Sequence, residues 1–250
     1  MDSFNKHLIM KNALLRAHVW AMMKLGKYGL GPKFSLYAKH VDGRYIIGEA
    51  WRKGEPWGLF RKSHPIQQYC APSPEGFFNT TYAPKTIVHK GHTYDVPFQN
   101  AGVSSKFTLT YPFKVEVAVT YRQTHPDMWD APLWLSGVKS WPPEIDVAEV
   151  WGKHWAPNLH WNEKANLKKS LHFKGYKHKI KPGTQYIWSV DAGLKYTKFY
   201  INGHLLRVVR TPKEILDTPM YIVVNSGAKN AYPKEDRANF LLHRIIYQQS

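Results

Sequence analysis

The chain has 250 residues, of which 43 % are hydrophobic, and this length suits one domain with a sizeable core. It carries 35 Lys and Arg against 18 Asp and Glu, a net charge of +17 that favours nucleic acid, anionic lipid or an acidic or sulfated polysaccharide as partner. The single cysteine, Cys70, excludes an intrachain disulfide and a cysteine-based zinc site, and no apolar run approaches the roughly 20 residues of a membrane span.

The first 30 residues form a basic amphipathic segment, which we separate from a single domain over 31–250. Apolar residues recur in the segment at mixed helical spacing, which fits a helix. Lys11 and Arg16 interrupt the apolar run and no A-x-A cleavage site follows, so the segment is not a clean signal peptide. A helix, a degenerate targeting segment and a disordered arm all stay open.

From about residue 33 onward the pattern predicts strands. KFSLYAKHVDGRYIIGEAW reads as two short strands around Asp42 and Gly43, whereas residues 62–100 are rich in Pro, Gly, His and Asn and are predicted as mostly loop. The pair FYI-NG-HLL predicts a hairpin. Further strands are expected in 102–112, 113–123, 131–138, 144–152, 185–193, 195–209, 220–228 and 240–248. Strands at this spacing without convincing helices predict an all-β sandwich or jelly roll.

The stretch SWPPEIDVAEVWG crowds three carboxylates into one predicted strand. Successive side chains of a strand point to opposite faces, so Glu144 and Asp146 share one face and Ile145 and Val147 the other. Strict alternation would place Glu149 on the apolar face, where an unpaired carboxylate is costly. We therefore predict a β-bulge at Val147–Ala148 that returns Glu149 to the face of the other two acids.

Such a row of carboxylates suits retaining glycoside hydrolysis. One carboxylate attacks the anomeric carbon and a second gives its proton to the leaving oxygen, with the two groups about 5 to 5.5 Å apart. A charged group between them can hydrogen-bond the nucleophile and raise the pKa of the acid. A solvated acidic strand edge and a calcium site are the alternatives that the residues themselves leave open.

Several motifs in order resemble glycoside hydrolase family 16, in the bulged version of laminarinases, agarases and carrageenases. EIDVAE fits the E-[hydrophobic]-D-x-x-E signature, and APLWLSG resembles the P-A-[FL]-W-L-L segment that precedes it. PNLHW is similar to T-L-H-W, and NFLLHRIIYQ to the closing F-x-V-D-Y-V-R-V-Y-Q. The resemblance covers roughly residues 72–248 and implies a concanavalin A-like jelly roll with a concave substrate cleft.

The resemblance also implies roles for individual residues. Glu144 would be the nucleophile, Asp146 its helper and Glu149 the acid/base. Trp134 and Trp141 would stack on sugar faces. The remaining substrate-binding candidates are His160, Trp161 and Asn225.

The expected activity is that of a retaining endo-glycosidase on a β-1,3/1,4-glucan or a galactan. A glycan-binding lectin-like jelly roll, a transglycosylase and a polyanion-binding β protein are the alternatives, and no nucleic-acid-binding motif is present. PNLHW favours a neutral β-glucan, while the charge and the lysines of 164–181 favour an anionic polysaccharide. We expect a monomer that needs no cofactor, with room in the family pattern for a structural calcium, and the family implies extracellular action.

Overall fold

The computed structural model describes residues 37–41, 44–47, 50–54, 60–61, 64–73, 75–89, 91–122, 128–151, 154–164, 167–172, 179–228 and 237–249. The segment 1–30 lies outside these residues, so the predictions made for it stay predictions. None of the helices among the described residues is long and apolar enough to cross a membrane.

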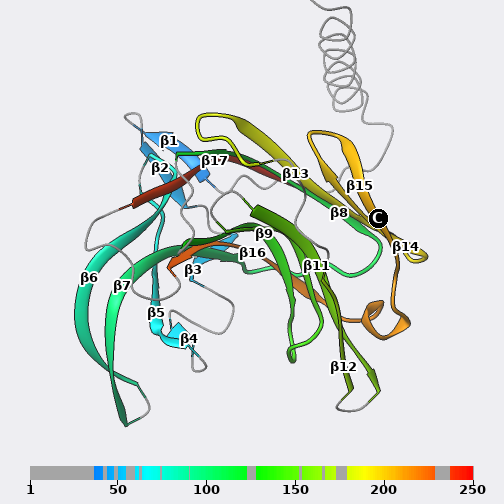
Figure 1. The fold of residues 1–250 in the computed structure, drawn as a ribbon, viewed down its shortest axis with the longest axis horizontal. Coiled ribbons are helices and arrows are strands. Elements are labelled where there is room, and N and C mark those ends of the chain that lie inside the picture. Colours follow the sequence, from blue (N-terminus) through cyan, green and yellow to red (C-terminus); the bar gives the residue numbers. More distant parts are fainter. Residues whose placement is uncertain are drawn as a thin grey trace, which may run out of the picture.

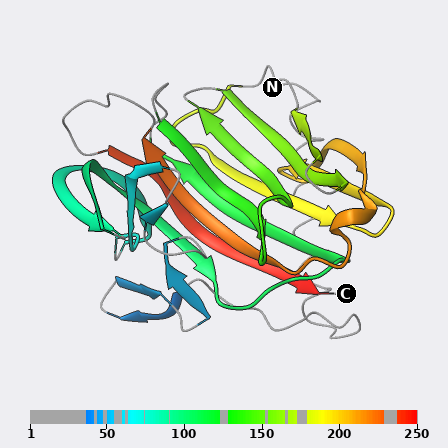
Figure 2. The ribbon, with the colours of Figure 1, turned by 90° about the horizontal axis from the view of Figure 1, so that it is seen from below.

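Two curved layers of antiparallel strands make up the fold (Figures 1 and 2). The inner layer runs in the order β12 (Leu167–His172), β11 (His154–Lys164), β10 (Glu144–Trp151), β9 (Met128–Gly137), β16 (Met220–Ala228) and β7 (His92–Ser105), and β3 (Trp51–Lys53) also pairs with β7. The outer layer runs in the order β15 (His204–Arg210), β14 (Tyr196–Ile201), β13 (Gln185–Ala192), β8 (Phe113–Tyr121), β17 (Arg237–Gln249) and β6 (Phe77–His89). Because β6 also pairs with β7, the layers belong to one hydrogen-bonded sheet.

The remaining elements are short. Strand β5 (His64–Cys70) pairs in parallel with β7, and β4 (Phe60–Arg61) pairs with β5. Strands β1 (Tyr37–Val41) and β2 (Arg44–Ile47) form a separate hairpin. The one helical turn among the described residues is a 3₁₀ turn, η1 (Lys213–Ile215).

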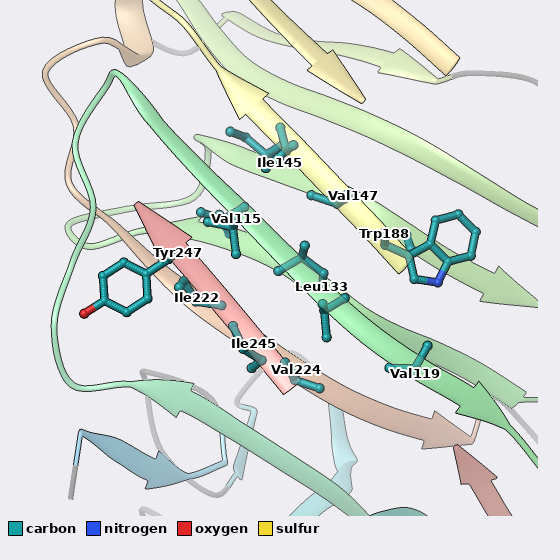
Figure 3. Close-up of a cluster of buried hydrophobic side chains, with 14 of the residues drawn as sticks. Val115, Val119, Leu133, Ile145, Val147, Trp188, Ile222, Val224, Ile245 and Tyr247 are labelled. Atoms are coloured by element: carbon teal, nitrogen blue, oxygen red, sulfur yellow. The ribbon is translucent and has the colours of Figure 1, made fainter. Parts of the chain in front are cut away.

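The core lies between the two layers and follows from alternation along the strands. In β8 the side chains of Val115, Val117 and Val119 are buried, and they face the inner layer. From the inner layer Ile145 and Val147 of β10 enter the same core, as Figure 3 shows. Because the inner layer packs this face against the outer layer, its opposite face is the concave underside of the arch in Figure 1.

One buried carboxyl group lies between the layers. Asp130 of β9 is 1 % exposed, and Asn239 of β17 donates a hydrogen bond from Nδ2 to its Oδ1 at 2.6 Å. The same amide group also donates to Thr80 Oγ1 of β6 at 3.3 Å. Burial raises the pKa of Asp130 from 3.8 to about 8, although the bond from Asn239 acts in the opposite direction.

The all-β jelly roll predicted from the strand spacing is confirmed. The hairpin β14–β15 is also confirmed, and its turn has Asn202 at φ 50° and Gly203 at φ 78°, both in the left-handed region that this two-residue turn requires. The two strands expected on either side of Asp42 and Gly43 are β1 and β2.

The prediction that 62–100 is mostly loop was wrong, because β5, β6 and much of β7 lie there. Residues 84–86 of β6 and 92–93 of β7 are exposed, and in Figure 1 this end of the pair curves away from the rest of the sheet. Strands whose side chains meet no core carry no apolar alternation, so their sequence looks like that of a loop.

Candidate active site

The three carboxylates reach one face through a bulge in β10. Glu144 lies opposite His160 of β11 and Asp146 opposite Asn158, but the next partners are Glu149 and Ala156. Three residues of β10 therefore oppose two of β11, which confirms the predicted bulge. The apolar residues between the acids are fully buried in the core, so the acids lie on the concave face.

Glu144, Asp146 and His160 form a compact group on that face. His160 Nε2 lies 3.2 Å from Asp146 Oδ2 and 3.9 Å from Glu144 Oε1. Asp146 is 4 % exposed and His160 is 8 % exposed, so both are largely removed from water. The ring of Trp141, which is 47 % exposed, stands 5.8 Å from the His160 ring at 42° between the planes.

Glu149 is held from both sides. Trp129 of β9 donates from its indole Nε1 to Glu149 Oε1 at 3.0 Å. Asn158 of β11 donates from Nδ2 to the other carboxylate oxygen, Oε2. Each oxygen thus accepts an N–H bond from a different neighbouring strand, which fixes the plane of the carboxylate.

Among the described residues, one group of side chains could bind a metal ion. Glu144, Asp146 and His160 each offer one atom within 4.8 Å of the other two. In the structure these groups lie instead within hydrogen-bond and ion-pair distance of one another, with His160 nearer to Asp146 than to Glu144.

The predicted site residues fall into three groups. Glu144, Asp146, Glu149, His160 and Trp141 come together around the bulge, as described above. Trp134 and Asn225 are buried beside them, with Trp134 at 2 % exposure and its Nε1 donating to Asn225 Oδ1 at 3.1 Å. Trp161 packs against the core between the layers, on the face opposite to its neighbour His160.

The sequence reasoning missed the two residues that hold Glu149. Asn158 could have been found, because it stands two residues before His160 on the same strand and so shares its face. Trp129 could not have been found by alternation, because it stands five residues before Trp134 and should face the other way. A register shift in β9, where 131–134 oppose only 223–225 of β16, brings both indoles to the concave side.

The chain is thus an arched jelly roll with three carboxylates of a bulged strand on its concave face. No family model and no curated relative matches the sequence, so the likeness to known proteins is one of structure. A variant of LamA from Zobellia galactanivorans, solved with laminaritriose and laminaritetraose, is similar at a TM-score of 0.68 and 17 % identity, over 88 % of this chain and 100 % of that one. The laminarinase catalytic domain from Thermotoga maritima is similar at 0.60 and 16 %, over 88 % and 100 %.

A third similar structure is SCLam, a non-specific endo-β-1,3(4)-glucanase from family 16, with a TM-score of 0.62 and 16 % identity over 88 % of this chain and 93 % of that one. These values establish that the chain has the fold of the family 16 glycoside hydrolases, as its motifs predicted.

Proposed function

We propose that the chain is a retaining, endo-acting glycoside hydrolase of family 16 that cleaves internal β-linkages of a polysaccharide. The observation that carries the proposal is the bulge in β10, which places Glu144, Asp146 and Glu149 together on the concave face of a family 16 fold. The bulge interrupts the alternation of β10 and moves Glu149 from the core face to the face of the other two acids, which packing in the core does not require. It is explained by a reaction that needs two carboxylates near one bond.

In the proposed reaction Glu144 attacks the anomeric carbon while the bond to the leaving oxygen breaks. Glu149 gives its proton to that oxygen, so the shortened chain leaves as an alcohol and the sugar remains as an ester on Glu144. In the second half Glu149, now a carboxylate, takes a proton from water as the water oxygen attacks the anomeric carbon. This step frees Glu144 and returns the proton to Glu149.

Asp146 and His160 support the nucleophile in this scheme. Asp146 stands between the two glutamates on β10, and His160 lies within 3.2 Å of it and 3.9 Å of Glu144. The close contact among these buried groups orients Glu144 toward the substrate. The exposed ring of Trp141 beside His160 is available to stack on a sugar next to the scissile bond.

A neutral β-glucan is the first substrate to test, because the similar structures include laminarinases and an endo-β-1,3(4)-glucanase. An anionic galactan is the second candidate, and one residue of the concave face favours it. Arg52 of β3 lies in a cross-strand row that passes through Ser104 and Val223 to Trp134 and then to Asp146. Four strand spacings of about 4.8 Å place it some 19 Å or less from Asp146 along the curved face.

Among the described residues, an aromatic ring and a backbone carbonyl hold Arg52 in place. Its guanidinium carbon lies 4.8 Å from the centre of the Tyr221 ring, and its NH2 group donates to Ser105 O at 3.0 Å. Among the described residues no carboxylate forms an ion pair with it. A half-buried cation fixed on the substrate face is suited to a sulfate or carboxylate group of the polysaccharide.

The test is an assay on laminarin, lichenan, agarose and carrageenans, with proton NMR of the first product to establish its anomeric configuration. Release of the β-anomer first supports retention, and the α-anomer first refutes it. Glu144→Gln should abolish hydrolysis while leaving glycan binding intact. Binding without cleavage by the wild type would favour the lectin-like alternative, and products longer than the substrate would favour transglycosylation.

The choice between neutral and anionic substrates is tested at Arg52. Arg52→Met should raise KM on a carrageenan and leave laminarin hydrolysis unchanged if the site takes an anionic group. The matched control is Lys53→Met, because Lys53 is the next residue along β3 and is exposed. Equal losses on both polymers would mean that Arg52 supports the fold rather than the choice of substrate.

A further inference from the structure

We propose that Trp129 and Asn158 are positioning residues that hold the carboxylate of Glu149 between two strands and thereby set the upper pH limit of catalysis. The inference rests on the proposed role of Glu149 as the acid/base. It concerns two residues that no sequence motif assigns.

The geometry makes the two residues a clamp. Trp129 reaches Oε1 from β9 and Asn158 reaches Oε2 from β11, on opposite sides of β10. Asn158 is 4 % exposed, and Trp129 packs against the buried group of Ala131, Trp134 and Val223, so both donors are fixed by their surroundings. The bulge leaves Glu149 outside the regular alternation of its own strand, and the neighbouring strands therefore supply its orientation.

The chemistry of the clamp favours one protonation state. An indole nitrogen and an amide nitrogen both donate hydrogen bonds, and neither can accept one. Two N–H donors directed at one carboxyl group stabilise its charged form more than its neutral form. The clamp therefore favours Glu149 as a base and lowers the pH at which it loses the proton needed for the first step.

Other titratable groups face the same site and act against the clamp. Glu144 and Asp146 from β10 carry like charges that favour a protonated Glu149. His160 of β11 lies beside those two, and Tyr221 of β16 faces the same side, while the side chains that β9 presents there are neutral. The upper pH limit of catalysis is thus raised by the like charges of Glu144 and Asp146 and lowered by the two N–H donors. Removing one donor should therefore raise it.

The first experiment is the pH profile of kcat/KM for Trp129→Phe on the polysaccharide that the wild type cleaves. A smaller aromatic ring replaces the indole and the N–H is lost, so the basic limb should move upward by about one pH unit, the size expected when a hydrogen bond to a charged group is removed. The matched control is Trp134→Phe, whose lost N–H donates to Asn225 Oδ1 at 3.1 Å. Its basic limb should stay where the wild-type limb is.

The second experiment uses a substrate that needs no acid. A 2,4-dinitrophenyl glycoside of a laminari-oligosaccharide has a leaving group that departs without a proton. With this substrate the burst of dinitrophenolate, which reports the first step, should be as fast in Trp129→Phe as in the wild type. Polysaccharide hydrolysis should be slower than in the wild type, because the acid is less well oriented.

Asn158→Asp gives an independent test with nearly the same side-chain shape. It removes the second N–H and adds a like charge beside Glu149, so it should move the basic limb upward by more than Trp129→Phe does. A wild-type far-ultraviolet circular dichroism spectrum and a cooperative thermal unfolding transition are required of each variant, and Asn158→Asp serves alone if Trp129→Phe does not fold.

The outcomes separate this inference from the proposed function. A wild type without activity on any glycan would refute the function. An active wild type whose basic limb is unchanged in both Trp129→Phe and Asn158→Asp would refute the clamp alone. A basic limb that moves equally in Trp129→Phe and Trp134→Phe would also overturn it. The shift would then follow from the loss of either tryptophan and not from the hydrogen bond to Glu149.

Discussion

Replacing the buried carboxyl group of Asp130 should change how the stability of the protein depends on pH. The pKa of Asp130 is raised by burial from 3.8 to about 8 in the folded chain, and its ordinary value applies when the chain unfolds. Between these two values the folded protein holds a proton that the unfolded chain has lost. Stability therefore falls as the pH rises from about 4 to about 8, and this contribution levels off above that range.

The magnitude follows from the size of the shift. Each pH unit corresponds to about 1.4 kcal/mol, and pH 7 lies about three units above the unfolded value, so the penalty at neutral pH is about 4 kcal/mol. Asp130→Asn keeps an oxygen that accepts the bond from Asn239 and never ionises. The amide that the substitution introduces at position 130 buries an N–H without a good acceptor, at a cost of about 1 kcal/mol. The variant should therefore be about 3 kcal/mol more stable than the wild type at pH 7.

The assay is urea unfolding of both proteins at intervals from pH 4 to pH 8.5. The difference in the free energy of unfolding should be near zero or slightly unfavourable to the variant at pH 4 and should grow in its favour up to pH 8. Two stability curves that stay parallel over the whole range would refute the reasoning, since they would show that Asp130 binds no extra proton on folding.

Three smaller predictions concern the backbone and one surface ion pair. A Cβ at Gly137 would lie 2.8 Å from Cδ of Pro143, so Gly137→Ala should destabilise the fold by about 1 to 3 kcal/mol. Under the proposed function it should also lower kcat, because Pro143 directly precedes Glu144 at the start of β10. Unchanged urea unfolding and kcat would contradict this. Gly203→Ala should lower the thermal midpoint, at a cost of about 1 kcal/mol, because its φ of 78° is strained for any residue with a Cβ. Glu116→Gln breaks the 2.9 Å pair with Arg244, whose side chain is 52 % exposed, and calorimetry should show a loss of less than about 1 kcal/mol.

The bulge and the hairpin turn could be predicted from the sequence. In one place a charged residue conflicts with the alternation of apolar and polar side chains, and in the other two residues favour a turn. Glu149 stands in an apolar position of its strand, and this conflict alone located the bulge. Asn202 and Gly203 tolerate positive φ, and they located a hairpin turn. In both places a few neighbouring residues carry the structural information, so one sequence is enough.

The parts that could not be predicted depend on residues that are distant in the chain. Trp129 joins the site only because β9 gains a residue relative to β16, and nothing near Trp129 in the sequence signals this shift. His160 and Trp161 were grouped because they share a motif, although adjacent residues of a strand face opposite ways. Motif matching identified the strand, whereas alternation decides which of its side chains lies on the concave face.

The order in which the strands are made imposes a constraint on folding during synthesis. Strand β16 lies between β9 and β7, and β17 lies between β6 and β8, so the two described strands that are made last fill internal positions in both layers. Before Met220 emerges, the edges of β7, β9, β6 and β8 have no neighbour on that side, and the apolar faces of both layers are incomplete. Such long-range pairing slows folding and leaves strand edges open to association with other chains. Nascent chains paused before Met220 should therefore depend on chaperones far more than chains from which Gln249 has emerged.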